Sequence, residues 1–248
     1  DKSVLMDMRQ IRKQDLSISG KHFDRFEKIL GFTKRPLKIA PAAHFTMGGV
    51  GTDPEGRTRL KGLYAVGEVA GGLHGANRAG GNALSEAVVF GTRCGKALIG
   101  DAALPCTEFR FDLSADRLFD LRFGSVSTCK PIKPPPTLKA LGDVLWNQAG
   151  IIRTEDGLNQ ALSFVDGMIE WTSAEGSRSP TDPRKKWALR AAALTSRAII
   201  ASALERTESR GAHFREDYPE ESGFWERNIH TAVNGSGVPE IIRADKIT

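Results

Sequence analysis

Residues 67–84 of the chain, GEVAGGLHGANRAGGNAL, decide how the rest of the sequence is interpreted. Six of these eighteen residues are glycine, and a single cation, Arg78, lies among them. A backbone without side chains can approach a flat or anionic ligand closely and direct several N–H groups toward it. The composition of the stretch fits a binding loop and a structural turn with a surface arginine equally well.

The segment that follows this loop has the pattern of a buried helix. Residues 83–98 are apolar on nearly every face, which predicts a helix packed deep inside a domain, and Asn82 can cap its start. The N-terminus of a helix carries about half a unit of positive charge. Arg78, whose planar guanidinium suits a carboxylate, lies just before it. Together they predict an anion pocket beside a flat cofactor.

A histidine upstream is the second candidate for this pocket. His44 ends an extended segment immediately before the run FTMGG at residues 45–49. It is either a hydrogen-bonded core residue or a second cation or donor for the same anion.

These stretches together resemble one family, the flavoprotein subunits of fumarate reductase and succinate dehydrogenase, which includes L-aspartate oxidase. The resemblance covers nearly the whole chain, apart from about 101–135 and the last twenty residues. Its motifs are HFTMGGV at 44–50, TD at 52–53, GxT at 56–58, GLYAVGE at 62–68, HGANR at 74–78, GNAL at 81–84, LWxxAGIIR at 145–153 and RTESRGAHFREDYP at 206–219.

The resemblance implies a substrate site and a cofactor. His44 and Arg78 match residues that bind the carboxylates of a dicarboxylate substrate, fumarate or succinate. The cofactor would be FAD, contacted by Glu68, Asn82, Ala83 and Leu84. The implied reaction is hydride transfer between the flavin and a carbon of fumarate, which two cations on the carboxylates would assist.

The chain departs from the family pattern in two respects. The fingerprint G-x-G-x-x-G, which holds the FAD pyrophosphate, does not occur in these 248 residues. Counted back from the family's equivalent of the strand at residues 4–8, the arginine that delivers the proton in the family is expected just upstream of Asp1. Arg9 and Arg12 do not match its motif. We therefore assign no catalytic proton donor. We expect the chain to be the C-terminal portion of a longer flavoprotein. It would share FAD with the missing N-terminal portion and would be inactive as an isolated chain.

The expected fold is α/β followed by all-α. Residues 1–100 would form the C-terminal part of a Rossmann-like FAD-binding domain, with strands near residues 4–8 and 63–66, the second of them buried. Residues 101–136 would be a linker ending in three prolines. Residues 137–248 would form a helical bundle, with helices capped by Thr137 and Thr154 and a third from Arg184 to about Ser209 that ends at Gly211.

The composition indicates which kinds of binding partner and which location to expect for the chain. The net charge of +5 is spread along the chain without a recognition motif, which favours small anions over nucleic acid. The three cysteines, Cys94, Cys106 and Cys129, have no metal-site spacing and indicate free thiols in a reducing compartment. No apolar run approaches the roughly 20 residues of a membrane span. We expect a cytoplasmic location, or association with a membrane through partner subunits such as an iron–sulfur subunit.

Two alternatives remain open. Within the family, the HFTMGG motif favours fumarate or succinate over L-aspartate as the substrate. Outside catalysis, the helical half can be an assembly module that docks a partner. The charged segment 208–217 can likewise be a scaffold for the flavin domain or a contact with a partner.

Overall fold

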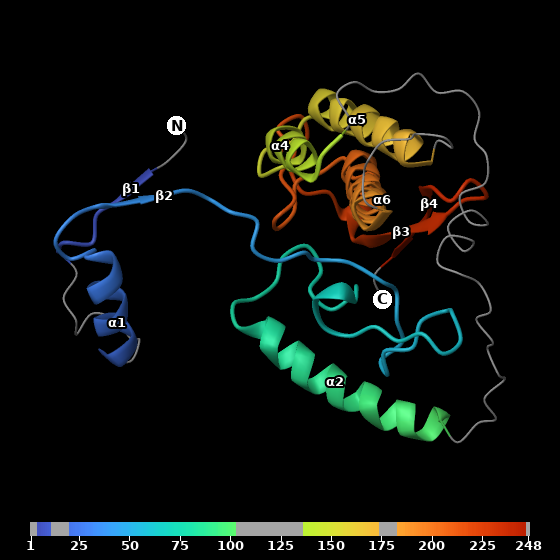
Figure 1. Cartoon of the computed structure of the whole chain (residues 1–248), viewed down its shortest axis with the longest axis horizontal. Coiled ribbons are helices and arrows are strands. Elements are labelled where there is room, and N and C mark those ends of the chain that lie inside the picture. The colour runs from blue at the N-terminus through green and yellow to red at the C-terminus, as the bar shows by residue number, and fades with distance from the viewer. Residues whose placement is uncertain (1–3, 11–19, 103–135, 174–182, 247–248) are drawn as a thin grey trace. The chain divides into compact units, whose positions relative to one another are not determined.

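A computed structural model describes residues 4–10, 20–102, 136–173 and 183–246 of the chain (Figure 1). The chain divides into two compact units, Asp1–Phe45 and Thr46–Thr248. Most of the expected linker, 103–135, lies outside the described residues, and so do Cys106 and Cys129.

The first unit is a short hairpin-like pair of strands with one helix between them. β1 (Val4–Met6) pairs antiparallel with β2 (Leu37–Ile39), and α1 (Gly20–Leu30) lies between them in sequence. The chain turns after α1 because the Glu27 carboxylate accepts the Thr33 N–H at 3.0 Å and the Thr33 hydroxyl at 2.6 Å. The strand expected near residues 4–8 is present as β1.

The second unit begins with irregular backbone. Between Thr46 and Gly81 its regular element is the 3-10 helix η2 (Gly67–Val69), and isolated bridges join Val50 to Ala70 and Arg57 to Tyr64. The prediction of a buried strand at 63–66 was wrong, since Tyr64 makes a single bridge and Leu63 is 50% exposed. A buried strand needs neighbouring strands on both sides. The described residues supply none here, and the Rossmann-like sheet is not confirmed.

The predicted helix after the loop is present as α2 (Asn82–Asp101). Its depth was predicted wrongly, because only Glu86 and Cys94 are buried, whereas Leu84 and Ile99 are each 78% exposed. The reason is that, among the described elements, α2 packs chiefly against η2. Asn82 is the first helical residue; the N-cap is Gly81, in left-handed conformation with φ 80°.

Three helices form the main core of the second unit. They are α4 (Leu138–Gln148), α5 (Glu155–Ser173) and α6 (Pro183–Glu205). Thr137 caps α4 by accepting the Ala140 N–H at 3.0 Å, and Thr154 accepts the Gly157 N–H at 3.2 Å at the start of α5, both as predicted. The fully buried apolar side chains belong to α5 and α6: Leu158, Ala161, Val165, Met168, Ala193 and Ile200.

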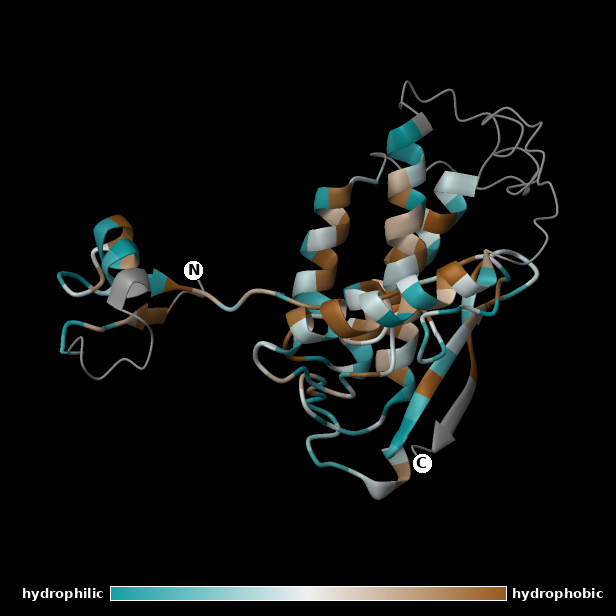
Figure 2. Ribbon diagram, turned by 90° about the horizontal axis from the view of Figure 1, so that it is seen from below, coloured by the Kyte–Doolittle hydropathy of each residue, from teal (hydrophilic) through white to brown (hydrophobic). Residues whose placement is uncertain are grey.

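The C-terminal part is not all helical, which corrects the expected fold. After the 3-10 helix η3 (Gly223–Trp225), β3 (Arg227–Val233) and β4 (Pro239–Lys246) form an antiparallel hairpin. β3 carries both hydrophilic and hydrophobic residues along its length (Figure 2). α6 contacts both α5 and the hairpin (Figure 1). The α6 residue Arg197 bonds Asp166 of α5 at 2.7 Å and also donates to the Pro239 carbonyl at the start of β4.

Candidate functional site

Glycines in the two motif stretches bring two backbones together. The Val50 N–H donates to the Val69 carbonyl at 2.8 Å, and the Gly71 N–H donates to the Val50 carbonyl at 2.9 Å. A Cβ on Gly49 would lie 2.2 Å from the Val69 oxygen, and one on Gly71 would lie 2.8 Å from the Gly49 nitrogen. Part of the glycine content is therefore required by packing between residues 49–50 and 69–71, independently of any ligand.

Glu68 lies on η2 beside this backbone contact. Its side chain is exposed, and Oε1 accepts the Thr46 N–H at 3.0 Å. The carboxylate thus ties the start of the second unit to η2 while it remains accessible to a ligand.

Arg78 lies in the loop that leads directly into α2. The residue is half-buried, and Nη1 donates to the Ala79 carbonyl at 3.2 Å. The N-cap of α2 makes no side-chain hydrogen bond to the helix, and Leu84 in its first turn is exposed. A guanidinium and a helix N-terminus without a side-chain cap therefore lie on consecutive segments, an arrangement that suits an anion.

A buried pair that the sequence did not single out holds this loop to the helix. His74 Nε2 lies 2.7 Å from Glu86 Oε2, and the two side chains are only 5% and 4% exposed. Because Glu86 is one turn inside α2 and His74 precedes Arg78, the pair fixes the loop against the helix. The available signal was a carboxylate near the start of a largely apolar helix, which a buried partner must satisfy.

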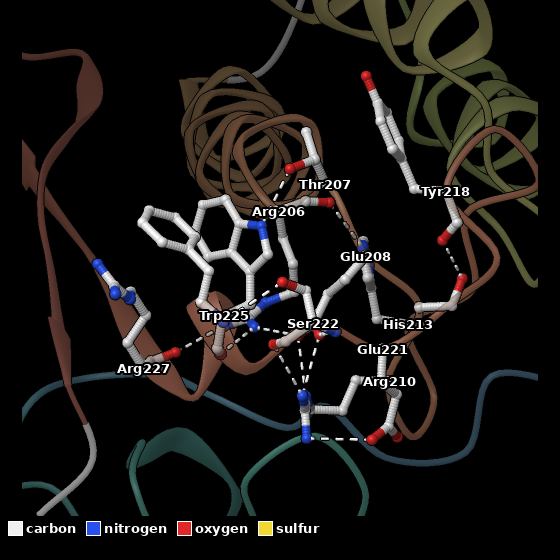
Figure 3. Close-up of polar contacts among 12 residues, drawn as sticks. Arg206, Thr207, Glu208, Arg210, His213, Tyr218, Glu221, Ser222, Trp225 and Arg227 are labelled. Atoms are coloured by element: carbon white, nitrogen blue, oxygen red, sulfur yellow. Dashed lines mark hydrogen bonds and ion pairs between the residues drawn. The ribbon is translucent and has the colours of Figure 1, made fainter.

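A second network organises the segment after α6, residues 206–222. Glu208 is fully buried and accepts from Arg206 at 2.6 Å, from Arg210 at 2.9 and 3.0 Å, and from the Ser222 N–H at 2.8 Å (Figure 3). Burial alone would raise the pKa of Glu208, but these hydrogen bonds outweigh it and lower the pKa to about 2.

Arg215 completes the same segment. It is 1% exposed, donates to Asp217 through two bonds of 2.7 Å, and donates to the Ala203 and Leu204 carbonyls at the end of α6. Asp217 in turn accepts the Glu155 N–H at the start of α5 at 2.8 Å. This geometry supports the scaffold interpretation of residues 208–217.

His213 is the titratable group most perturbed toward neutrality in this segment. Its Nδ1 lies 2.8 Å from Arg153 Nη1 and its Nε2 lies 3.3 Å from the Arg206 carbonyl. Since arginine only donates and a carbonyl only accepts, Nδ1 accepts and Nε2–H donates. Burial, followed by the charge of Arg153, lowers the pKa of His213 to about 4.

The other residues that the sequence analysis singled out lie outside the loop that carries Arg78. His44 is exposed in the first unit, after β2, whereas Arg78 and Glu68 belong to the second unit, so their joint action on one ligand stays a prediction. Arg9 forms an ion pair with Asp7 at 2.6 Å, and Arg12 lies outside the described residues. Cys94 is a buried free thiol in α2.

The residues around the start of α2 fit a flat, electron-rich cofactor. A Cβ added at Gly80 or Gly81 would meet no atom within 4 Å, so the backbone there is open to a ligand. The adjacent helix N-terminus supplies N–H groups for carbonyl oxygens and offsets negative charge. Within the described residues, no group of three or more His, Cys, Asp or Glu side chains could hold a metal ion.

Two family models match separate parts of the chain. Residues 8–84 match the model described as an FAD binding domain, and residues 138–240 match the fumarate reductase flavoprotein C-terminal domain.

Individual relatives and solved structures are consistent with these two family matches. A fumarate reductase (CoM/CoB) subunit of Methanothermobacter marburgensis is 35% identical over 78% of this chain and 36% of its own length. L-aspartate oxidase of Rhodospirillum rubrum is 43% identical over 75% of this chain and 60% of its own length. The Mycobacterium smegmatis Sdh1 complex in the apo form and a mutant E. coli quinol fumarate reductase align with TM-scores of 0.70 and 0.76, at 28% and 25% identity, over 99% of this chain and 44% of theirs.

The fold and the motifs define an FAD-binding flavoprotein. The chain belongs to the fumarate reductase and succinate dehydrogenase family of flavin-dependent oxidoreductases, to which L-aspartate oxidases are related. It spans about a third of the length of several of these relatives and less than two thirds of each one named above. Of the helices that the structure describes, none has the length and apolarity to cross a membrane.

Proposed function

We propose that the chain contributes the substrate arginine and the flavin-facing helix start of an enzyme that interconverts fumarate and succinate. The observation that carries the proposal is the position of Arg78, on a loop fixed to α2 by the buried pair His74–Glu86. An arginine held in this way, just before a helix N-terminus without a side-chain cap, suits a carboxylate that must lie against a cofactor.

Each residue has one role in this proposal. Arg78 binds one carboxylate of the substrate, and His44 binds a carboxylate of the same molecule. Glu68 accepts from hydroxyl groups of FAD, while the backbone of Asn82, Ala83 and Leu84 faces the flavin ring. When bound, FAD supplies the hydride chemistry. Arg78 then orients the double bond and stabilises the negative charge that develops on the substrate during transfer.

L-aspartate oxidation is the second candidate. The 43% identity to the Rhodospirillum rubrum L-aspartate oxidase favours it, and L-aspartate offers the same pair of carboxylates to Arg78 and His44. The two candidates differ in how the substrate's central carbons are recognised, a task for which we assign no residue in this chain.

The test uses the full-length protein, including any residues that precede Asp1. Turnover is measured with fumarate and a reduced dye, with succinate and an oxidised dye, and with L-aspartate and oxygen. Arg78→Ala is expected to lower kcat/KM by about 100-fold or more while FAD absorbance per protein is retained. Arg93→Ala is the matched control, because Arg93 is an exposed α2 arginine paired with Glu55.

The outcomes separate the candidates. Activity with fumarate and succinate that Arg78→Ala abolishes supports the first proposal, and activity with L-aspartate alone supports the second. Full activity in Arg78→Ala contradicts both. A protein that binds a partner subunit normally but never turns over a dicarboxylate would favour the assembly module instead.

The isolated 248-residue chain is proposed to be inactive, because no G-x-G-x-x-G motif occurs in it and it spans only part of its relatives. Detectable fumarate reduction by the purified chain would contradict this proposal. We further propose that the complete protein docks an iron–sulfur subunit, since its structural neighbours include multi-subunit complexes. Co-purification from the native host would test that.

A further inference from the structure

The turn after α6 touches the loop that carries Arg78. The Ala212 N–H donates to the Ala76 carbonyl at 2.9 Å. Gly211 has φ +59°, and a Cβ there would lie 2.6 Å from the Ala76 oxygen and 2.9 Å from the Ala76 Cβ. A side chain larger than hydrogen therefore cannot be placed at Gly211 unless one of the two backbones moves. The contact lies two residues before Arg78.

The turn itself is held on several sides. The Arg210 N–H donates to the His213 carbonyl at 2.8 Å, and the His213 N–H returns a bond to the Arg210 carbonyl at 3.0 Å. The Arg210 side chain is bound to buried Glu208, and buried Arg215 follows the turn directly. Moving the turn would break these ion pairs. A side chain added at Gly211 would therefore displace the loop that contains Ala76 and not the turn.

On its other side, the same loop is fixed by the side-chain pair His74–Glu86. Ala76 lies midway between His74 and Arg78, so its position determines how the chain leaves the buried pair and reaches the guanidinium. The loop of residues 74–78 is thus held by α2 from one side and by the C-terminal turn from the other.

We propose that Gly211 and Ala212 are positioning residues for Arg78, through which the C-terminal domain sets the geometry of the substrate site. The proposal rests on the proposed function of Arg78 and extends it to two residues that touch neither substrate nor cofactor. The expected effect is large, because a displacement of about 1 Å in a substrate-binding group can cost about 100-fold in rate.

Gly211→Ala in the full-length protein tests the proposal. The matched control is Gly237→Ala in the β3–β4 turn, where φ is +75° and the nearest atom to a Cβ is Arg190 Nη2 at 3.7 Å. Both variants carry the strain of an alanine at positive φ, but only Gly211→Ala meets a backbone carbonyl. The readouts are FAD content, the urea midpoint, kcat/KM for the dicarboxylate substrate, and the affinity for malonate, measured from the change in flavin absorbance.

We expect Gly211→Ala to weaken malonate binding and lower kcat/KM by about 10- to 100-fold relative to Gly237→Ala, with FAD content unchanged. Equal malonate affinity and kcat/KM in the two variants would overturn the proposal. If Gly211→Ala does not fold, Ala76→Gly tests it, because loosening the loop should weaken malonate binding while FAD is retained, and unchanged affinity would overturn it. A wild-type protein that binds no malonate and turns over no dicarboxylate would instead overturn the proposed function, and this assignment with it.

Discussion

His74 Nε2 and Glu86 Oε2 are 2.7 Å apart, and both side chains are almost completely withdrawn from water. The pair joins a loop residue to a residue one turn inside α2, across a stretch that is rich in glycine and alanine. A loop of this composition has high conformational entropy when unfolded, so one buried side-chain bond has a large effect on where Arg78 lies.

Glu86→Ala should therefore destabilise the protein by about 2–4 kcal/mol, because it leaves the buried His74 imidazole without its carboxylate. Glu86→Gln, which keeps a hydrogen-bonding oxygen at the same place, should cost less. Urea unfolding of the full-length protein measures both. Asp143→Ala, which breaks an exposed pair with Lys139, is the control and should change stability by less than about 0.5 kcal/mol.

Gly49→Ala should be far more damaging than Gly48→Ala. A Cβ at Gly48 meets nothing within 4 Å, so its cost is the strain of positive φ, about 1–2 kcal/mol. A Cβ at Gly49 would collide with the Val69 carbonyl at 2.2 Å, which would separate the two backbones and remove their hydrogen bonds. Thermal unfolding of the two variants compares the costs, and similar midpoints would show that the backbone contact is not required.

Glu208→Gln should destabilise the second unit strongly, by about 3–5 kcal/mol, because the buried carboxylate is the shared acceptor of Arg206 and Arg210. Glu221→Gln is the matched control, since Glu221 is 64% exposed and contacts Arg210 from the solvent side at 3.3 Å. Its expected cost is below about 0.5 kcal/mol. Chemical denaturation at pH 7 distinguishes the two, and equal costs would mean that the buried network contributes nothing beyond a surface pair.

Acid should destabilise the protein partly through His213. Its pKa is lowered to about 4 in the folded state from an ordinary value near 6.5, so the unfolded state takes up a proton first as the pH falls. The stability that neutral His213 provides is complete above about pH 6.5 and is lost progressively down to about pH 4, by roughly 2–3 kcal/mol.

His213→Gln should flatten this dependence. The measurement is the free energy of unfolding from pH 7 to pH 4 for the wild type and the variant. The carboxylates of Glu208 and Asp217, with pKa values lowered to about 2, lose their contributions at lower pH, between about 4.5 and 2. Parallel pH profiles for the two proteins would show that folding does not lower the pKa of His213.

The local signals in the sequence were reliable where one residue determines the structure. Thr137 and Thr154 cap their helices because a hydroxyl before a helix satisfies free N–H groups whatever the surroundings. The helix after Gly81 was likewise readable from its apolar residues. The hairpin β3–β4 was missed, although the alternation in RNIHTAV and the turn NGSG at 234–237 were visible in the sequence.

Contacts between residues that are far apart in the sequence could not be predicted in the same way. Nothing near Gly211 in the sequence indicates that it lies against Ala76, and its glycine was interpreted as the end of α6, which stops at Glu205. The pairing of His74 with Glu86 also required the loop to fold back on the helix. Arg78 was singled out by the glycine-rich loop before a helix start and Glu68 by the family motif, and their roles on the ligand stay predictions.

The exposed apolar residues of α2 affect how this chain behaves during purification. The side of the helix that holds Glu86 and Cys94 is buried. Leu84, Val88 and Ile99 are apolar residues that are each 68–78% exposed. Exposed apolar residues of this kind cause proteins to adhere to one another and to hydrophobic resins. The 248-residue chain should therefore self-associate at working concentrations, and any segment that covers α2 should improve its behaviour in solution.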